Sequence, residues 1–180
     1  MLTITIPENQ LWDDERERFI NIKEQTIQLE HSLSSIADWE SKWCKPFYSN
    51  TEKTYEETID YIRFMTITEG VDPNAYYGLS DKNVSDINAY VESPMTATTF
   101  SNKNKGRKNG GVITAEIIYY WMISLNIPLE CDKWHINRLM TLIRVCSEKN
   151  NPGKKMSAKE IASRNAAINA ANRKRFNSKG

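Results

Sequence analysis

The stretch from Ile113 to Lys149 is the most apolar part of the chain, and it limits the possible folds more than any other segment. It contains two runs in which apolar residues recur at helical spacing, separated by Asn126-Ile127-Pro128. Proline interrupts a helix in its interior but fits the first turn of the next one. The stretch therefore predicts a helical hairpin over 113–149 on which the other segments pack.

The first helix of this predicted hairpin is apolar almost all round. One face is expected to consist of Ile113, Ile117, Tyr120, Trp121, Ser124 and Leu125. Ile118, Tyr119 and Met122 extend the apolar surface beyond that face. A helix that is apolar on most sides is covered on most sides, by its own chain or by another subunit. Unless the N-terminal strands cover Ile118, Tyr119 and Met122, we expect these three residues to bind a partner.

Three further helices are predicted before this stretch, near 33–44, 55–69 and 81–92. Each begins at a residue that favours the N-cap position, which is Ser32 or Ser34 for the first, Thr54 for the second and Ser80 for the third. Thr54 is also followed three residues later by Glu57, which completes a capping box.

Short strands are predicted near the N-terminus, at 2–6, 19–22 and 26–29, because these segments are β-branched and alternate in polarity. The highly charged residues 8–18 are predicted to form a loop. The expected fold class is therefore α+β: mainly α, with a small N-terminal antiparallel β element and the hairpin 113–149 packed on the other helices.

The charges are unevenly distributed, although the net charge is only +1. Residues 1–100 carry 18 acidic and 8 basic side chains, whereas residues 149–180 carry 9 basic and 1 acidic. Residues 101–111 are basic and contain no large apolar side chain, so we expect a flexible loop there. The predicted organisation is a compact helical domain over 1–149, with N-terminal strands in 2–29, followed by a basic helical tail over 150–180.

The basic tail is Ala-rich and carries only a thin apolar stripe, so we expect a helix that docks on a partner. Its candidate partner-binding residues are Lys154, Lys155, Ile161, Arg164, Ile168, Arg173, Lys174, Arg175 and Phe176. Two partners fit these residues. An acidic protein surface, including the acidic half of another copy, is favoured over nucleic acid, because the tail lacks interleaved aromatic residues and the acidic body repels DNA.

The sequence also argues against several classes of chemistry. It lacks the nucleotide-binding, serine-hydrolase and zinc-protease motifs. Its two histidines, His31 and His135, are expected to be core or capping residues. Cys44, Cys131 and Cys146 lack metal-site spacing, so we expect reduced and mostly buried thiols. We predict a non-enzymatic protein with no cofactor, no metal and no membrane segment, since no apolar run approaches about 18 residues.

Several short motifs, spread over nearly the whole chain, together carry a family resemblance. They are LEHSL at 29–33, WESKW at 39–43, KPF at 45–47, TIDYIR at 58–63, MT at 65–66, MTAT at 95–98, ITAE at 113–116, YYWM at 119–122, IPLEC at 127–131, WHINRL at 134–139, LIRVC at 142–146 and KKMS at 154–157. With these motifs the chain resembles a family of small proteins encoded in the structural gene clusters of tailed bacteriophages and prophages.

This resemblance implies a role in virion morphogenesis, in particular that of a tail assembly chaperone that keeps tape-measure or tail-tube subunits soluble in the host cytoplasm. It implies no catalytic residues. One alternative is a structural virion component, such as a head–tail or tail protein, whose strands in 2–29 add to a neighbour's sheet. A second alternative is a DNA-binding accessory protein that acts through residues 150–180.

Overall fold

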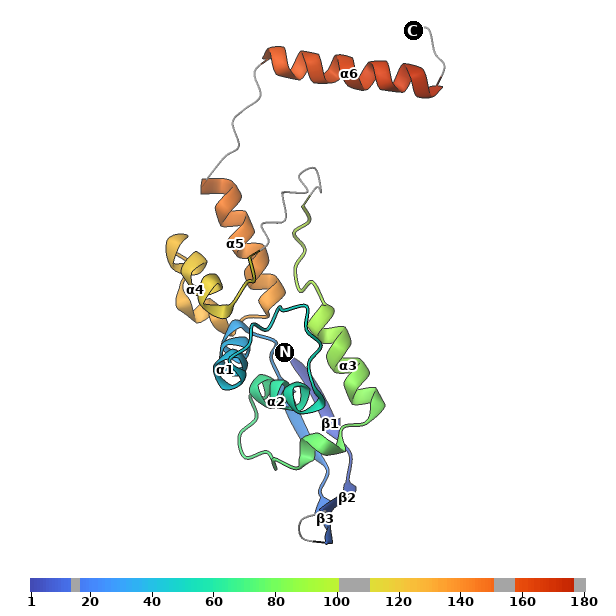
Figure 1. Cartoon of the computed structure of the whole chain (residues 1–180), viewed down its shortest axis with the longest axis vertical. Helices are drawn as coiled ribbons and strands as arrows, with labels where there is room; N and C mark the ends of the chain where they lie inside the picture. Colours follow the sequence, from blue (N-terminus) through green and yellow to red (C-terminus); the bar gives the residue numbers. More distant parts are fainter. Residues whose placement is uncertain (14–16, 101–110, 151–157, 177–180) are drawn as a thin grey trace. The chain divides into compact units, whose positions relative to one another are not determined.

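The computed structural model describes residues 1–13, 17–100, 111–150 and 158–176 (Figure 1). The chain divides into two compact units, Met1–Val145 and Cys146–Gly180. The predicted loop 101–111 falls almost entirely outside the described residues. The fold class is the expected one, mainly α with a small antiparallel β element at the N-terminus.

The N-terminal strands form one long antiparallel hairpin. Strand β1 (Leu2–Ile6) pairs with β4 (Gln25–Leu29), and β2 (Asn9–Asp13) pairs with β3 (Arg18–Ile22). The pairs Ile6↔Gln25 and Asn9↔Ile22 lie in the same register, so the two ladders continue each other across Pro7. The prediction of a loop over 8–18 is wrong for residues 9–13, because these residues pair across the hairpin with 18–22.

One face of the hairpin is buried, as its alternating polarity predicts. Ile4, Ile6, Ile22, Ile27 and Leu29 are all buried. Helix α3 (Asp81–Glu92) and the 3₁₀ helix η1 (Ala75–Gly78) pack against β1. A two-stranded sheet needs such cover, because it cannot bury its own apolar face.

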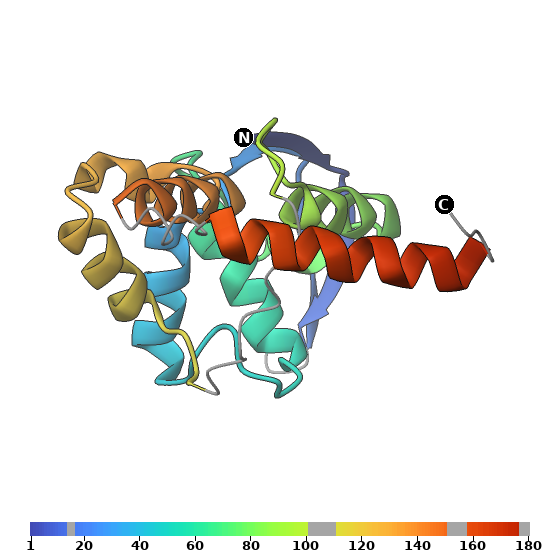
Figure 2. The ribbon, with the colours of Figure 1, turned by 90° about the horizontal axis from the view of Figure 1, so that it is seen from above.

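Helices α1 (Leu33–Trp43) and α2 (Tyr55–Met65) lie side by side and form the centre of the first unit (Figure 2). Ser32 caps α1 and Thr54 caps α2, each through its side-chain oxygen. Helix α2 ends at Met65, four residues earlier than predicted. The chain turns there to run along β4, where the Ile67 N–H donates to the Gln28 carbonyl at 2.8 Å.

Polar contacts fix the spacing between α1 and α2. The Trp39 indole N–H donates to the Glu57 carbonyl at 2.7 Å, and Trp39 itself is buried. Lys45 forms an ion pair with the Glu57 carboxylate, and Lys42 forms another with Asp60. Because Glu57 and Asp60 are buried, both need these cationic partners.

The two helices predicted within 113–149 are confirmed as α4 (Ala115–Ser124) and α5 (Ile136–Asn150), with the 3₁₀ helix η2 (Leu129–Lys133) between them. Helix α4 packs against α1 and η2. Helix α5 starts beside the end of α3, where the Asn137 side-chain amide donates to the carbonyls of Val91 and Ser93.

The second unit contains the last residues of α5 and helix α6 (Ala158–Phe176). Helix α6 corresponds to the basic helical tail predicted over 150–180, but the division between the units falls after Val145, not after Lys149.

Candidate partner-binding surface

The residues predicted to bind a partner from the first helix of the hairpin lie mostly in the core. Ile118 and Met122 are fully buried, so the prediction that they form a free surface is wrong. Helix α1 and η2 cover this side of α4, and the N-terminal hairpin is not needed for it. Tyr119 is only half-buried, and its hydroxyl donates to Asp132 Oδ2 at 3.1 Å.

The opposite side of α4 is exposed instead. Ile117 is 36 % exposed, Tyr120 66 % and Ile123 63 %. These three residues, which we call the α4 strip, follow one another at three-residue intervals along one side of the helix. The sequence predicts Ile117 and Tyr120 on one apolar face of this helix together with Trp121. Large apolar residues that gather on one exposed side of a helix mark a binding surface more often than scattered ones do.

The α4 strip lies on a helix whose start is bonded to α1 and whose end is closed by its own last turn. At its start, the Ala115 N–H donates to Glu40 Oε2 of α1 at 2.7 Å. The other carboxylate oxygen of the buried Glu40 accepts from the Phe47 N–H at 2.6 Å. At the other end, the Ile127 N–H donates to the Met122 carbonyl at 2.9 Å. The strip is therefore presented in one orientation without a partner.

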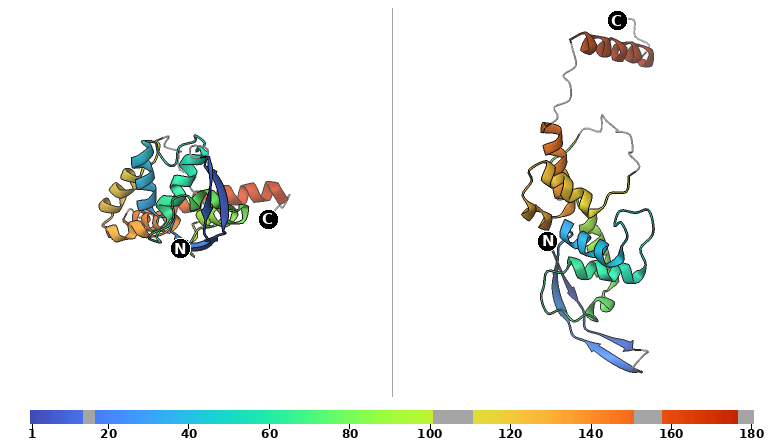
Figure 3. Two further views of the ribbon diagram at one scale, coloured as in Figure 1. Left: turned by 90° about the horizontal axis from the view of Figure 1, so that it is seen from below. Right: turned by 60° about the vertical axis from the view of Figure 1, so that its left-hand side comes forward.

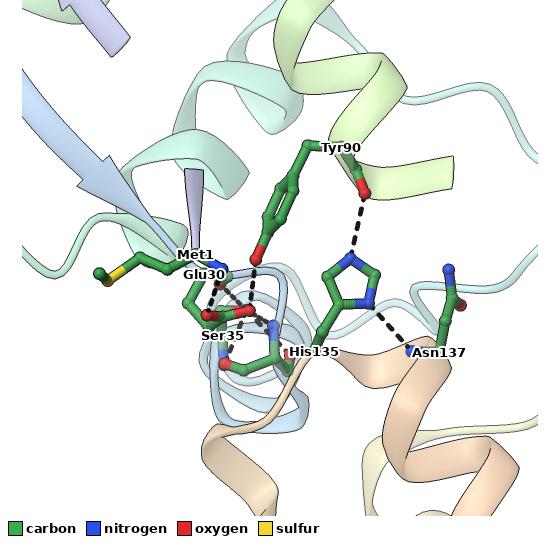
Figure 4. Close-up of polar contacts among 7 residues, drawn as sticks. Met1, Glu30, Ser35, Tyr90, His135 and Asn137 are labelled. Carbon is green, nitrogen blue, oxygen red and sulfur yellow. Dashed lines mark hydrogen bonds and ion pairs between the residues drawn. The ribbon is translucent and has the colours of Figure 1, made fainter. Parts of the chain in front are cut away.

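His135 is the N-cap of α5, as the sequence predicts (Figure 4). Its Nδ1 accepts from the Asn137 N–H at 3.3 Å, so the proton sits on Nε2, which donates to the Tyr90 carbonyl at 3.1 Å. Both ring nitrogens are thereby occupied. Burial lowers the pKa of His135, which keeps the ring neutral. The residue is a structural cap at the contact between α5 and α3.

His31 lies in the core next to His135, with ring centroids 5.1 Å apart. Its Nδ1 is hydrogen-bonded to the Tyr61 hydroxyl. Burial, and then the neighbouring His135, lower the pKa of His31 to about 4. A neutral imidazole buried among aromatic rings fits the predicted core histidine.

The candidate residues of the basic tail are only partly within the described residues. Arg164, Ile168, Arg173 and Arg175 are exposed on α6. Ile161, Lys174 and Phe176 belong to the same helix, but their side chains fall outside the description, as do Lys154 and Lys155 altogether.

The cysteines, the candidate metal ligands and the hydropathy of the helices also bear on the kind of site. Cys131 is buried and Cys146 partly so, but Cys44 is exposed, contrary to the expectation of mostly buried thiols. The residues that the structure describes include no cluster of His, Cys, Asp and Glu able to hold a metal ion. Nor do they include a helix with the length and hydropathy needed to span a bilayer.

The sequence missed one exposed apolar pair, Trp12 and Phe19. Their rings meet edge to face at 4.9 Å across β2 and β3, and their exposed fractions are 51 % and 64 %. The pair lies on the part of the hairpin that extends away from the helices (Figure 3). The sequence NQLWD of β2 does not alternate in polarity, so only the pairing of Trp12 with Phe19 across the hairpin brings the two rings together.

Comparison with known proteins yields no relative: the chain matches no protein-family model, and neither a curated protein nor a solved structure is significantly similar to it.

Proposed function

We propose that the chain is a non-enzymatic morphogenesis factor of a tailed bacteriophage, a chaperone-like protein that binds tape-measure or tail-tube subunits during tail assembly. The motifs described above supply the biological context. The observation that carries the binding role is the α4 strip, which presents Ile117, Tyr120 and Ile123 on one exposed side of a fixed helix.

The strip suits a partner that exposes apolar surface before it assembles. Burying a large apolar side chain contributes about 1.5–3 kcal/mol, so three such residues supply a useful part of an interface energy. Because α4 is bonded to Glu40 at Ala115 and packs on α1 and η2, little conformational entropy is lost when the partner binds.

Helix α6 supplies a second kind of contact. Arg164, Arg173 and Arg175 are exposed along it, together with Ile168. Such a helix favours an acidic protein surface, which belongs to the partner or to the acidic half of a second copy. An apolar contact at α4 and a charged contact at α6 are complementary ways to hold an unassembled subunit.

Co-expression tests the proposal. The chain is produced with the tape-measure or tail-tube protein of the same phage, and the soluble yield of each partner and its co-purification with the chain are measured. We expect a higher soluble yield and a stable complex with one of them. The double variant Tyr120→Glu/Ile123→Glu should lose the complex, whereas Ser85→Glu, at an exposed polar position on α3 away from the strip, should keep it. Absence of a complex with either partner contradicts the proposal.

A second candidate is a structural virion component, which the exposed pair Trp12 and Phe19 favours. A two-stranded ribbon with an aromatic pair near its end suits strand addition to a neighbour's sheet. Mass spectrometry of purified particles separates the two candidates. A structural component is present in the mature virion, whereas an assembly chaperone remains in the host cytoplasm.

A further inference from the structure

A groove of about 410 Å³ lies between α2 and α3. Val84, Ile87 and Val91 line it along about two turns of α3, and Ile59 and Ile62 line it along α2. Its volume is in the range of about 300–1,000 Å³ that is typical of small-molecule sites. The groove is formed by helices other than α4, so it is distinct from the α4 strip.

Lys53 is the only cationic residue among the described residues that line the groove. Its ammonium donates to the Phe47 carbonyl at 2.8 Å and lies 4.0 Å from the centroid of the Phe47 ring. No carboxylate of the described residues forms an ion pair with it. Lys45, by contrast, is paired with Glu57.

The position of Lys53 is costly for a charged group. Burial lowers the pKa of Lys53, although the nearby Glu57 partly counteracts this effect. An ammonium in apolar surroundings is stabilised when it donates a hydrogen bond to a carboxylate and forms an ion pair with it. The groove thus combines mostly apolar walls with one cation, Lys53, that has hydrogen-bonding capacity left, and with one carboxylate, Asp81, at the start of α3.

We propose that this groove binds an aliphatic carboxylate, with the hydrocarbon chain along α3 and the carboxylate group at the Lys53 ammonium. The apolar walls account for the chain, and Lys53 selects the acid over a neutral molecule of the same length. This binding activity goes beyond the proposed morphogenesis role and does not depend on it.

The test is a calorimetric titration of the full chain with sodium hexanoate, octanoate, decanoate and dodecanoate. Each carboxylate is used below its critical micelle concentration. Affinity should rise about fourfold for each added methylene until the groove is filled. Decanol should bind at least tenfold more weakly than decanoate, because it cannot form the charge-assisted hydrogen bond.

Three variants locate the site. Lys53→Met removes the charge and should abolish the preference for decanoate over decanol. Lys82→Met makes the same change on α3 at an exposed position outside the groove and should leave that preference intact. Val84→Trp, at a half-exposed position on the groove, should block binding of every chain length. Circular dichroism establishes that each variant is folded.

The proposal is overturned if no carboxylate saturates the wild-type chain, if decanol binds as well as decanoate, or if Lys53→Met and Lys82→Met behave alike. A protein segment, not a carboxylate, occupies the groove if no carboxylate binds and Val84→Trp reduces co-purification with a tail protein. That result also overturns the proposal.

Discussion

Acidification should destabilise the fold well above the pH at which carboxylates titrate, because of His31. This residue is only 3 % exposed, and its ring contacts those of Tyr61 and His135. Its pKa is about 4 in the folded chain and 6.5 in the unfolded chain. Between these two values the unfolded chain binds more protons, so the free energy of unfolding falls as the pH falls.

The magnitude follows from the two pKa values. Full stability is present above pH 6.5, and about 2 kcal/mol is lost from His31 alone on going from pH 7.5 to pH 5.0. The loss is complete near pH 4, where it reaches roughly 3 kcal/mol. The pKa of His135 is also lowered by burial, so His135 acts in the same direction as the pH falls below 6.5. The pKa of the Glu57 carboxylate is lowered, chiefly by its hydrogen bond from Lys45, so its contribution to stability is lost mainly as the pH falls below 4.5.

Urea unfolding at pH 7.5, 6.5, 5.5 and 5.0, followed by tryptophan fluorescence and circular dichroism, measures the effect. His31→Asn keeps a polar atom near the position of Nδ1 but does not titrate. It should lower stability at every pH and reduce the difference between pH 7.5 and pH 5.0 by about 2 kcal/mol. Since the chain has only two histidines, His31→Asn/His135→Asn should remove most of the slope. A wild-type stability that is constant from pH 7.5 to pH 5.0, or an unchanged slope in His31→Asn, refutes the reasoning.

Three other substitutions test the fold by urea unfolding at pH 7.5. Thr54→Ala removes the N-cap of α2 and should cost about 1 kcal/mol, whereas Thr51→Ala, at an exposed position, should be nearly neutral. Met122→Ala should cost about 2–5 kcal/mol of stability because it leaves a core cavity. Tyr120→Ala should change stability by less than about 0.5 kcal/mol. A larger loss for Tyr120→Ala than for Met122→Ala would place the opposite face of α4 in the core. Glu40→Gln should cost about 2 kcal/mol, because an amide cannot accept from both backbone N–H groups that Glu40 binds.

The helix starts were predictable from the sequence because a cap is a local interaction. Ser32, Thr54 and Ser80 each bond to a backbone N–H three residues later, so the residue types alone carry the signal. The role of His135 as a core or capping residue was also predictable, since a polar residue near the start of an apolar helix is a natural cap. Its bond to the Tyr90 carbonyl was not, because that contact joins segments 45 residues apart.

Two predictions failed because they depended on contacts between distant segments. Strand β2 lies in a highly charged stretch, and only its pairing with β3, including Trp12 opposite Phe19, makes it a strand. The orientation of α4 was ambiguous because apolar residues occur almost all round it, so the pattern within the helix does not distinguish its buried side from its exposed side. Contacts with α1 determine which side of α4 is buried, and the residue pattern of α4 alone carries no information about these contacts.

This ambiguity explains why the α4 strip exists. A helix with a polar outer face needs no partner, but α4 has apolar residues on both sides, and a chain of this size covers only one of them. The Glu40 carboxylate decides which side, because its bond to the Ala115 N–H fixes the start of α4 against α1. With Ile118 and Met122 turned into the core, Ile117, Tyr120 and Ile123 have to face outward. The fold and the proposed binding surface therefore depend on the same contact between α1 and α4.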